Sequence, residues 1–581
     1  MKIINKILYF LDPNLRFSAF FLIILLIFNA LAESLSVALI IPITLFFFEN
    51  NLIETYPNFF NFIEFFSPFK YSNIDYSNKI LIISGLLTIF CFLIILRIIF
   101  NILFLYYKAS LQFKTRYLLT KKLIDGYFNI PGDKFLNKNI SSLAFSAINE
   151  TSHVSSCVGL LFVLISEFFL LLCIFGILVF YQTEITIILS IIVGISSYIF
   201  VIFFKKKINL FAVTRREGEE ENSKQVYEMF DGLMEIKSYG VISYFLDKYL
   251  NNFNQYLKNL KFSEVLPGLP KLWLEFISLI TISILLTYMI GNDYSQAMII
   301  STLGLYIGAV FRLMPSVNKI INAIQSIKYL EPIINNLLKD HESIKKNKFF
   351  IENNIKKIKM NSELDLKNIS YGYDPKNLVL DNASFIVKKN QKIGISGQSG
   401  CGKSTLIKII AGLIKPNKSE FIIDNKTFIR DDYLNLSGIA LVPQNIFIIN
   451  DTIKKNIAFG IEDQKIDKNK VNNCIKEVQL ENMIKSINDG IDHKLLERGK
   501  NLSGGQIQRI GIARALYFNP DIIIFDESTS SLDQENEQKI LKLIEKISYD
   551  KTIIFISHRK EVLNFCDITY HMENKKIYVQ E

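Results

Sequence analysis

Cysteine is scarce in this sequence: six cysteines are scattered among 581 residues. None of them has the close spacing of a zinc site or of a disulfide framework, so neither is expected to hold the fold together. A basic arm or stripe is also lacking, although the net charge is +10. Nucleic acid is therefore not an expected partner. No internal repeat array is present either.

Apolar residues, by contrast, are abundant. They make up 50% of the chain, Phe alone occurs 48 times, and the mean hydropathy is +0.27. Such values are typical of a membrane protein. Crossing a bilayer takes about 20 apolar residues. Six stretches meet this requirement, at residues 17–48, 79–107, 143–181, 184–204, 270–290 and 296–328.

The first of these stretches begins like a signal peptide. Basic residues precede it, and Ala30-Leu31-Ala32 imitates a cleavage site. The apolar character nevertheless continues to Phe48. A run of this length favours a retained first spanning helix over a cleaved leader.

Basic residues indicate how the spans are oriented. They gather in two long segments between spans, as Lys108, Lys114, Arg116, Lys121, Lys122, Lys134 and Lys138, and as Lys205, Lys206, Lys207, Arg215, Arg216 and Lys224. The short connections at 182–183 and 291–293 contain no Lys or Arg. By the positive-inside rule, both termini are expected in the cytoplasm.

The loops follow from this orientation. The outside loop at 49–78 is rich in aromatic residues, which fits either an amphipathic helix at the membrane surface or a loosely packed loop. Each long cytoplasmic segment is expected to be a helix hairpin that ends in a short transverse helix, near 122–129 and 226–234.

The composition changes near residue 334. The following stretch is rich in Lys and Asn, and after it short apolar strands alternate with amphipathic helices. This alternation is typical of a parallel α/β domain. The predicted organisation is a membrane domain at 1–333, a linker at 334–362 and an α/β domain at 363–581.

The first functional motif of the α/β domain is a complete phosphate-binding loop. The segment from Gly397 to Ser404 reads GQSGCGKS and lies between a predicted strand and a predicted helix. Backbone N–H groups and the helix N-terminus would surround the phosphates of ATP, Lys403 would reach the β and γ oxygens, and Ser404 would hold Mg²⁺. The expected contacts are Gly397, Gln398, Ser399, Gly400, Cys401, Gly402, Lys403, Ser404 and Thr405.

A second apolar strand, at 522–525, ends in an acidic pair, Asp526 and Glu527. The carboxyl end of a buried parallel strand is where the Mg²⁺ of a nucleotide is expected. Asp526 is therefore predicted to bind the ion, directly or through water. Glu527 is predicted to polarise the water that attacks the γ-phosphate.

The segment Leu502-Ser503-Gly504-Gly505-Gln506 resembles the signature sequence of the ABC ATPases. In that family these residues meet the γ-phosphate bound by the other subunit. Further motifs of the family follow in order, and the resemblance implies a role for each. Tyr373 would stack on adenine (a core tyrosine is the alternative), Gln444 would reach Mg²⁺ and the attacking water, Asp533 would cross between subunits, and His558 would contact the γ-phosphate. The segment Glu497–Gly499 is similar to one that contacts the membrane domain in exporters.

This resemblance implies the fold class and the assembly. The fold expected is a membrane all-α domain of six transmembrane helices, of the ABC exporter type, with a cytoplasmic α/β P-loop ATPase domain. The signature and the phosphate loop serve different partners. One chain is therefore a half-transporter, and a homodimer is expected, with a heterodimer as the alternative. The cofactors are ATP and Mg²⁺.

Two arginines inside the predicted spans indicate the substrate. Arg97 and Arg312 both lie about 25 Å from the outer ends of their spans, and Lys271 begins the fifth span. In a dimer these residues would form a basic collar suited to an amphipathic anion. The alternative is that they reach the headgroups or pair with acidic residues, for which the candidates are Glu33, Glu167 and Glu275.

The membrane half also resembles the lipid-linked oligosaccharide flippases of bacterial protein glycosylation. The resemblance rests on the segment Arg312–Lys319, on Arg97 followed by Asn101, and on Leu269-Pro270-Lys271 leading to Glu275. Lys271 stands where an arginine is expected. The implied function is ATP-driven flipping of a membrane lipid, a polyprenyl-pyrophosphate-linked oligosaccharide. A lipid or multidrug exporter without glycan specificity is one alternative, and a soluble-type ABC ATPase without a transport role is another.

Overall fold

The computed structural model describes most of the chain in two units. The first consists of residues 1–127 and 138–346, and the second of 128–137 and 347–581. The description covers residues 2–39, 79–130, 135, 139–181, 183–265, 268–294, 296–346, 359–374, 377–428, 438–527 and 534–580. Within these ranges only the backbone is described for 203–216 and for some other residues, among them Lys271.

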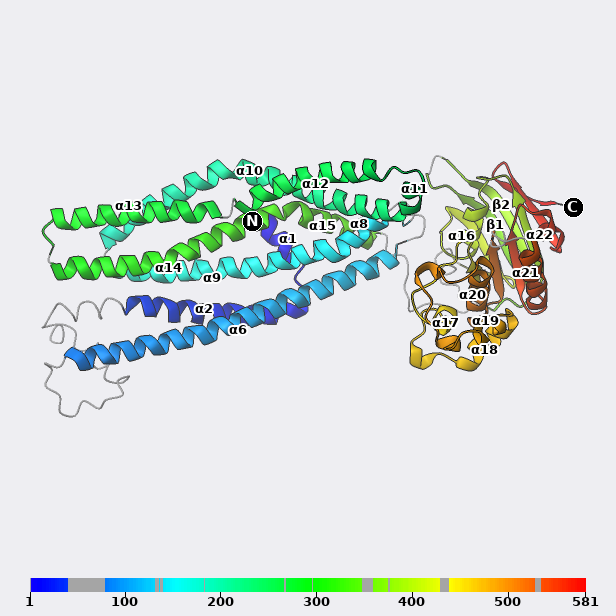
Figure 1. The fold of residues 1–581 in the computed structure, drawn as a ribbon, viewed down its shortest axis with the longest axis horizontal. Helices are drawn as coiled ribbons and strands as arrows, with labels where there is room; N and C mark the ends of the chain where they lie inside the picture. Colours follow the sequence, from blue (N-terminus) through cyan, green and yellow to red (C-terminus); the bar gives the residue numbers. More distant parts are fainter. Residues whose placement is uncertain are drawn as a thin grey trace. The chain divides into compact units, whose positions relative to one another are not determined.

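The first unit is helical throughout its described part (Figure 1). Its longest helices are α6, α10 and α14, and a proline lies inside α14 at Pro315. The helices are α1 (Lys2–Tyr9), α2 (Arg16–Ala38), α6 (Lys79–Phe128), α8 (Ile140–Phe145), α9 (Thr151–Tyr181), α10 (Thr183–Asp231), α11 (Leu233–Ser238), α12 (Ile242–Val265), α13 (Leu269–Gly291), α14 (Gln296–Tyr329) and α15 (Glu331–Lys346).

Within the described residues, five helical stretches are long and apolar enough to cross a membrane: Pro13–Ala38, Gly85–Phe128, Ile140–Phe180, Leu272–Gly291 and Met298–Tyr329. They coincide with five of the six predicted spans. The remaining one, at 184–204, lies in α10, where many side chains are not described. The predicted span at 184–204 therefore stays a prediction. The predicted outside loop at 49–78 lies outside the described residues.

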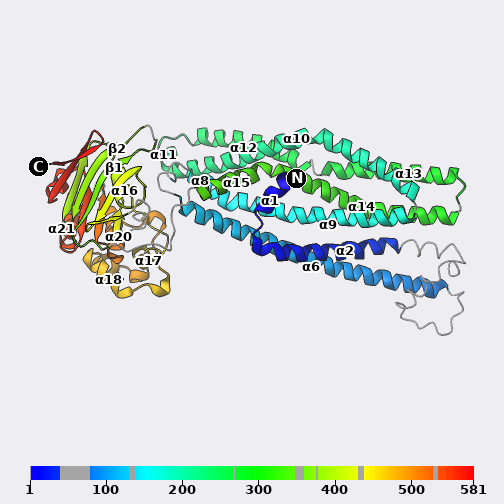
Figure 2. The ribbon, with the colours of Figure 1, turned by 180° about the vertical axis from the view of Figure 1, so that it is seen from behind.

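Helix α9 lies at the centre of the membrane unit. It packs against α2 and against α14, and α13 packs along α14 (Figure 2). A cluster of buried apolar residues joins these helices, including Ala30, Ile174, Leu285 and Leu305. The hydroxyl groups of Thr186 on α10 and Tyr306 on α14 lie 2.7 Å apart in a buried hydrogen bond. Helix α10 is thereby tied to the same bundle.

The structure corrects two boundaries. Residues 122–128 continue α6 and do not form a separate transverse helix, whereas α11 does follow α10 as a short separate helix at the other tip. Helix α15 also extends into the predicted linker as far as Lys346. Ile334, Leu337 and Ile344 are buried on one face of it. Apolar residues at helical spacing within a Lys- and Asn-rich stretch make this segment part of the bundle.

The second unit contains two sheets. One has four antiparallel strands in the order β2-β1-β4-β5, and the other has six strands in the order β10-β9-β3-β8-β7-β6, parallel except for the β9–β10 pair. The strands are β1 (Glu363–Tyr371), β2 (Leu380–Lys388), β3 (Lys392–Gly397), β4 (Lys418–Ile423), β5 (Lys426–Phe428), β6 (Ile439–Val442), β7 (Ile522–Asp526), β8 (Thr552–Ile556), β9 (Ile568–Glu573) and β10 (Lys576–Gln580).

Helices α16, α20 and α22 contact the six-stranded sheet. The described helices of this unit are α16 (Lys403–Ile410), α17 (Ile453–Ile457), α18 (Lys468–Glu477), α19 (Glu481–Lys485), α20 (Gly504–Tyr517), α21 (Gln534–Ile547) and α22 (Lys560–Asn564). Strand β8 is buried along its whole length, and β7 is buried up to Phe525. Near-continuous apolar runs are the pattern of parallel strands covered on both faces. The predicted α/β class of this domain is confirmed.

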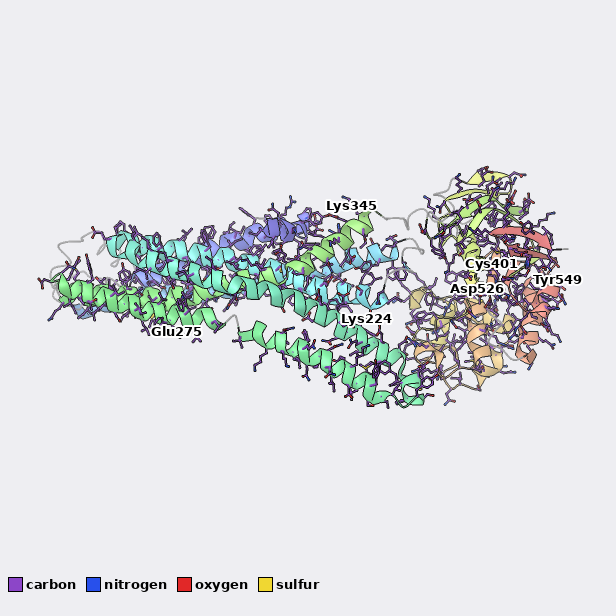
Figure 3. All side chains as sticks on the ribbon, turned by 90° about the horizontal axis from the view of Figure 1, so that it is seen from above. Lys224, Glu275, Lys345, Cys401, Asp526 and Tyr549 are labelled. Atoms are coloured by element: carbon purple, nitrogen blue, oxygen red, sulfur yellow. The ribbon has the colours of Figure 1, made fainter. Side chains whose placement is uncertain are left out.

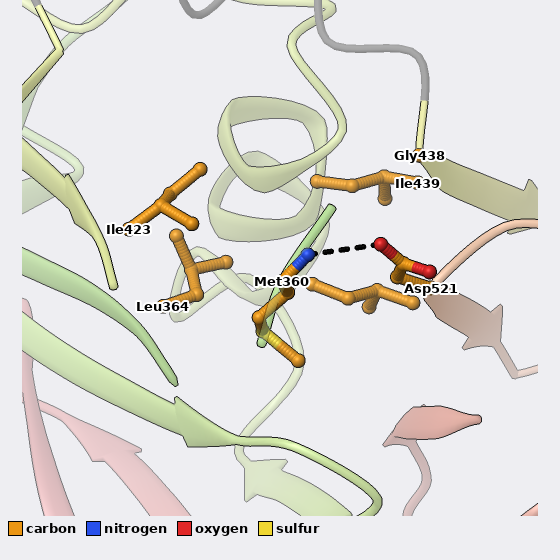
Figure 4. A pocket seen from close by; sticks show the side chains of 7 residues that line it. Met360, Leu364, Ile423, Gly438, Ile439 and Asp521 are labelled. Atoms are coloured by element: carbon orange, nitrogen blue, oxygen red, sulfur yellow. Dashed lines mark hydrogen bonds between the residues drawn. The ribbon is translucent and has the colours of Figure 1, made fainter. Parts of the chain in front are cut away.

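Met360, just before β1, is tied to Asp521, just before β7 of the other sheet. The backbone N–H of Met360 donates to the Asp521 carboxylate over 2.9 Å (Figure 4). The small pocket around this bond is otherwise apolar and is lined by Leu364, Ile423 and Ile439, among others. A buried N–H satisfied in this way holds the start of β1 in register with the sheet beside it.

Candidate nucleotide-binding and membrane sites

The phosphate loop connects β3 to α16, and its backbone requires glycine. Gly397 has a φ of 146° and Gly402 a φ of 107°, conformations that other L-residues rarely adopt. A Cβ at Gly397 would lie 2.5 Å from the Met572 carbonyl oxygen, and one at Gly402 would lie 2.9 Å from Cγ1 of Val379. The loop therefore combines an unusual backbone with close packing. Both constraints explain the glycines of the motif.

Lys403 lies inside this loop. Its side chain is buried, and its Nζ atom donates to the carbonyl oxygens of Gly397 over 2.7 Å and Gln398 over 2.9 Å. The ammonium group is thus held where phosphate oxygens are expected. Ser404, at the start of α16, is exposed. Its hydroxyl is therefore accessible to a Mg²⁺ ion, as predicted.

The acidic pair lies at the carboxyl end of β7, and Figure 3 labels Asp526 together with Cys401 of the loop. Burial raises the pKa of the Asp526 carboxyl above its ordinary 3.8, and the charge of Glu527 adds to the rise, while Lys408 and Lys403 oppose it. These two lysines are the first and sixth residues of α16. The end of β7 therefore lies close enough to the phosphate-loop helix for their charges to interact.

Glu527 leaves the strand in an unusual conformation. Its φ is 45°, and its N–H donates to the Ile556 carbonyl oxygen over 3.2 Å. A positive φ in a residue other than glycine costs energy and often marks a functional position. The turn places its carboxylate between two other predicted residues.

Those two residues are Gln444 and His558. Nε2 of Gln444 donates to Oε2 of Glu527 over 3.4 Å, and Nε2 of His558 lies 3.4 Å from Oε1. Gln444 follows β6, Glu527 ends β7, and His558 follows β8. These strands are neighbours in the sheet. The structure therefore brings the three predicted catalytic residues into contact.

The signature segment begins α20. Ser503 is its N-cap: the Ser503 hydroxyl accepts the N–H of Gln506 over 3.3 Å, and Oε1 of Gln506 accepts the N–H of Ser503 over 2.9 Å. This reciprocal capping box fixes the first turn. Ser503 and Gly504 are exposed. Gln506 thus has a structural role besides the phosphate contact predicted for it.

Tyr373 is not a core residue. It is 47% exposed, whereas Tyr371, whose ring lies edge-to-face against it at 5.2 Å, is 2% exposed. The hydroxyl of Tyr373 lies 3.4 Å from that of Thr405 on α16. The exposure argues against the core-tyrosine alternative, and stacking on adenine stays a prediction.

Part of the predicted site lies outside the described structure. Asp533 belongs to the undescribed segment 528–533, and the side chain of Glu497 is also not described. In the described residues no group of three or more His, Cys, Asp or Glu side chains gathers as a metal site. Ser404 and Asp526 provide oxygen ligands of the kind that Mg²⁺ takes in small number, the rest coming from water and phosphate.

In the membrane unit both arginines meet one acid. Nε of Arg97 on α6 lies 3.4 Å from Glu33 on α2, and the guanidinium of Arg312 on α14 pairs with the same carboxylate. The Glu33 side chain is only 3% exposed. Pairing with an acidic residue was the alternative to a basic collar that binds substrate, and the structure shows this pairing. Of the three candidate acids, Glu33 is the direct partner of both arginines. The side chain of Lys271 is not among those described.

Comparison with known families identifies the chain. Residues 380–530 match the ABC transporter family, and residues 19–314 match the ABC transporter transmembrane region. The second match alone covers half of the chain. This protein belongs to the ABC transporter family. The predicted family membership is thereby confirmed, and a soluble-type ATPase is excluded.

Relatives of this ABC transporter include exporters and a flippase. It is 30% identical over 357 residues to an ATP-dependent lipid A-core flippase of Saccharophagus degradans, over 60% of this chain and 58% of that protein. It is 34% identical over 297 residues to a putative export ATP-binding/permease protein of Rickettsia typhi, over 50% of this chain and 49% of the other. The matches span about half the length of these relatives.

A solved structure shows the same fold over nearly the whole transporter. A bacterial Atm1-family ABC exporter with ATP bound has a TM-score of 0.76 to this chain at 18% identity, and the match covers 97% of this chain and 96% of that one. The exporter-type fold predicted from the sequence is therefore confirmed.

Proposed function

We propose that this ABC transporter uses the binding and hydrolysis of Mg²⁺–ATP to flip an amphipathic anion across the bacterial inner membrane. The anion proposed is a polyprenyl-pyrophosphate-linked oligosaccharide. The observation that carries the proposal is the excess of two partly exposed arginines, Arg97 and Arg312, over the one buried carboxylate that they meet, that of Glu33. Both termini are placed in the cytoplasm, as the distribution of basic residues indicates.

The ATPase reaction follows from the contacts around Glu527. Its carboxylate accepts the proton of the attacking water as general base, and Gln444 and His558, which touch it, orient that water and contact the γ-phosphate. Lys403 exchanges its two carbonyl partners for phosphate oxygens. Ser404 and Asp526 would hold Mg²⁺, which would supply positive charge against the phosphates.

A second subunit completes each site. Ser503 and Gly504 are exposed at the N-terminus of α20, where N–H groups and the helix dipole favour an anion. In the proposed homodimer they close over the γ-phosphate held by the partner's phosphate loop. A heterodimer with a similar half-transporter would place the same groups in the same way.

The charge balance in the membrane unit supports an anionic substrate. Lys319 on α14 is matched by one acid, since its Nζ donates to Glu167 on α9 over 2.6 Å. Arg97 and Arg312 share Glu33, and Glu167 also acts electrostatically on Arg97, so the three cations of these two pairs share two acids. Charge inside a membrane is costly and indicates a substrate pathway. A pyrophosphate supplies the missing negative charge.

A lipid or multidrug exporter without glycan specificity is the second candidate. The flippase named for lipid A-core among the relatives supports a lipid substrate of some kind. This candidate predicts that an anionic headgroup is not required, so the two hypotheses differ in their dependence on Arg97 and Arg312.

The test is reconstitution of the full-length protein in proteoliposomes. ATP hydrolysis is measured with and without a polyprenyl-pyrophosphate oligosaccharide, together with transfer of that lipid between leaflets. Transfer that requires ATP and is lost in Glu527→Gln and Arg312→Ala, but not in the control Lys248→Ala on the exposed face of α12, supports the proposal. Hydrolysis without transfer of this lipid would leave only the second candidate.

A further inference from the structure

Glu33 joins three helices of the membrane unit. It belongs to α2, and its partners Arg97 and Arg312 belong to α6 and α14. Glu33 is 2% exposed, whereas the side chains of Arg97 and Arg312 are 30% and 27% exposed. The carboxylate is therefore enclosed, while each guanidinium retains an accessible side. An incoming anion would reach the arginines and not the acid.

The cluster is short of hydrogen-bond acceptors for its donors. Two guanidinium groups carry ten N–H bonds between them, and one carboxylate cannot accept all of them. Nε of Arg312 is buried and has no hydrogen-bond partner among the described residues. Oδ1 of Asn29, one helical turn before Glu33, and Oε1 of Glu33 are buried acceptors without a hydrogen-bond partner among the described residues. The ten guanidinium N–H bonds still outnumber these acceptors, so the arginines retain donors for a further anionic group.

A second ion pair in the same unit has a different composition. Lys319 and Glu167 form a pair of one cation and one acid, and Glu167 is also buried. Glu167 also acts electrostatically on Arg97, although the two form no direct ion pair. Among the described residues, two arginines therefore pair directly with Glu33, whereas a single lysine pairs directly with Glu167.

We infer that Glu33 is an internal counter-ion that competes with the anionic headgroup of the substrate for Arg97 and Arg312. This inference rests on the proposed function. Without substrate, Glu33 holds the two arginines together and keeps α2, α6 and α14 in contact. A bound pyrophosphate takes over the arginines and repels the carboxylate, so α2 is released from its neighbours. When Glu33 re-forms its ion pairs, it expels the anion.

Competition between Glu33 and the substrate for the two arginines keeps substrate binding reversible. A transport site must bind its substrate well enough to load and weakly enough to unload. Two desolvated arginines alone would hold a pyrophosphate tightly, because charge-assisted hydrogen bonds are strong. Glu33 lowers that affinity by offering the arginines another anion. Removal of its charge is therefore expected to tighten binding and to slow release.

The experiment uses the full-length protein in phosphatidylcholine vesicles, with polyprenyl pyrophosphate as the probe. The concentration of probe that half-maximally stimulates ATP hydrolysis is measured, and so is the maximal rate of probe transfer. In Glu33→Gln the half-maximal concentration is expected to fall about tenfold, within the usual range of coupling between sites, and the maximal transfer rate is expected to fall as well. Glu33→Asp, which retains the charge, is expected to stay near wild type.

The control is Glu167→Gln, which removes a buried carboxylate that pairs directly with Lys319 and acts on Arg97 only at longer range. Its half-maximal concentration should fall much less than that of Glu33→Gln. An equal fall in Glu33→Gln and Glu167→Gln would overturn the inference, since any lost acid would then have the same effect. If Glu33→Gln does not fold, Glu33→Ser is measured in its place. An unchanged half-maximal concentration in the folded variant would also overturn it.

Two arginine variants separate this inference from the proposed function. If Arg97→Gln and Arg312→Gln leave stimulation by the probe unchanged, the anionic substrate itself is wrong. If both weaken stimulation while Glu33→Gln leaves the half-maximal concentration unchanged, only the role of Glu33 is wrong. Phosphatidylglycerol in place of the probe tests whether a single phosphate is sufficient.

Discussion

Nε2 of His558 lies 3.4 Å from Oε1 of Glu527, across the ends of the neighbouring strands β8 and β7. The histidine side chain is 49% exposed and the glutamate 31%, so both remain accessible to a nucleotide. Gln444 contacts the other carboxylate oxygen. Glu527 is therefore held from two sides by residues that can orient a water molecule against the γ-phosphate.

Glu527→Gln is expected to abolish most ATP hydrolysis and to leave ATP binding intact. The amide keeps the size of the side chain and can still bond to Gln444, but it cannot take a proton from water. Loss of a general base lowers the rate by about 10²–10⁴-fold. Phosphate release and nucleotide binding are measured on the same preparation. Glu477→Gln, an exposed change on α18, serves as the control, and near-normal hydrolysis in Glu527→Gln would assign the base to another residue.

Lys403→Ala is expected to weaken ATP binding by at least about tenfold, because a charge-assisted hydrogen bond to phosphate is lost. The variant also leaves the carbonyl groups of Gly397 and Gln398 without their donor. Binding of a fluorescent ATP analogue measures the effect. Lys418→Ala, at an exposed position in β4, should bind ATP normally. Unchanged affinity in Lys403→Ala would show that the ammonium does not contact the phosphates.

Asp526→Asn is expected to change how stability depends on pH. Burial raises the pKa of this carboxyl above 3.8, so the folded chain disfavours its ionised form. The stabilising contribution of the protonated form is complete below pH 3.8 and is lost as the pH rises through the raised pKa. Without nucleotide, the Tm of Asp526→Asn should therefore rise relative to wild type between pH 3.8 and neutral. Parallel Tm curves, like those expected for the exposed control Asp550→Asn, would contradict this.

The pKa of Asp424 is shifted in the opposite direction from that of Asp526. Burial opposes the shift, but N–H donors from Asn361, Ser362 and Glu363 and the hydroxyl of Ser362 lower the pKa of Asp424 to about 2. Its ionised form therefore stabilises the fold above pH 3.8, and this contribution is lost as the pH falls toward 2.

Asp424→Asn should consequently lower the Tm at neutral pH, because three backbone donors at the start of β1 lose a charged acceptor. The deficit should shrink as the pH falls from 3.8 toward 2. Asparagine suits the positive φ of 47° at this position, so backbone strain does not add to the effect. A deficit that is constant with pH would show that the charge is not responsible.

The phosphate loop was predictable because its determinants are local. The glycines, Lys403 and Ser404 lie within eight consecutive residues, and the strand before them and the helix after them impose the loop geometry. The buried parallel strands were predictable for the same reason, since their apolar runs are continuous in the sequence. The linker was predicted less well, because a few apolar residues in α15 outweigh a composition rich in Lys and Asn.

The sequence by itself determined the family, the nucleotide-binding loop and the presence of charged residues in the spans, because each of these is encoded by contiguous residues or by composition. Only the tertiary structure decided which residues meet. The contact of Gln444 and His558 with Glu527 depends on the order β8-β7-β6 in the sheet. The choice of Glu33 over other acids depends on the packing of helices far apart in the sequence. Such pairings arise from long-range burial and charge compensation, which no local pattern in the chain specifies.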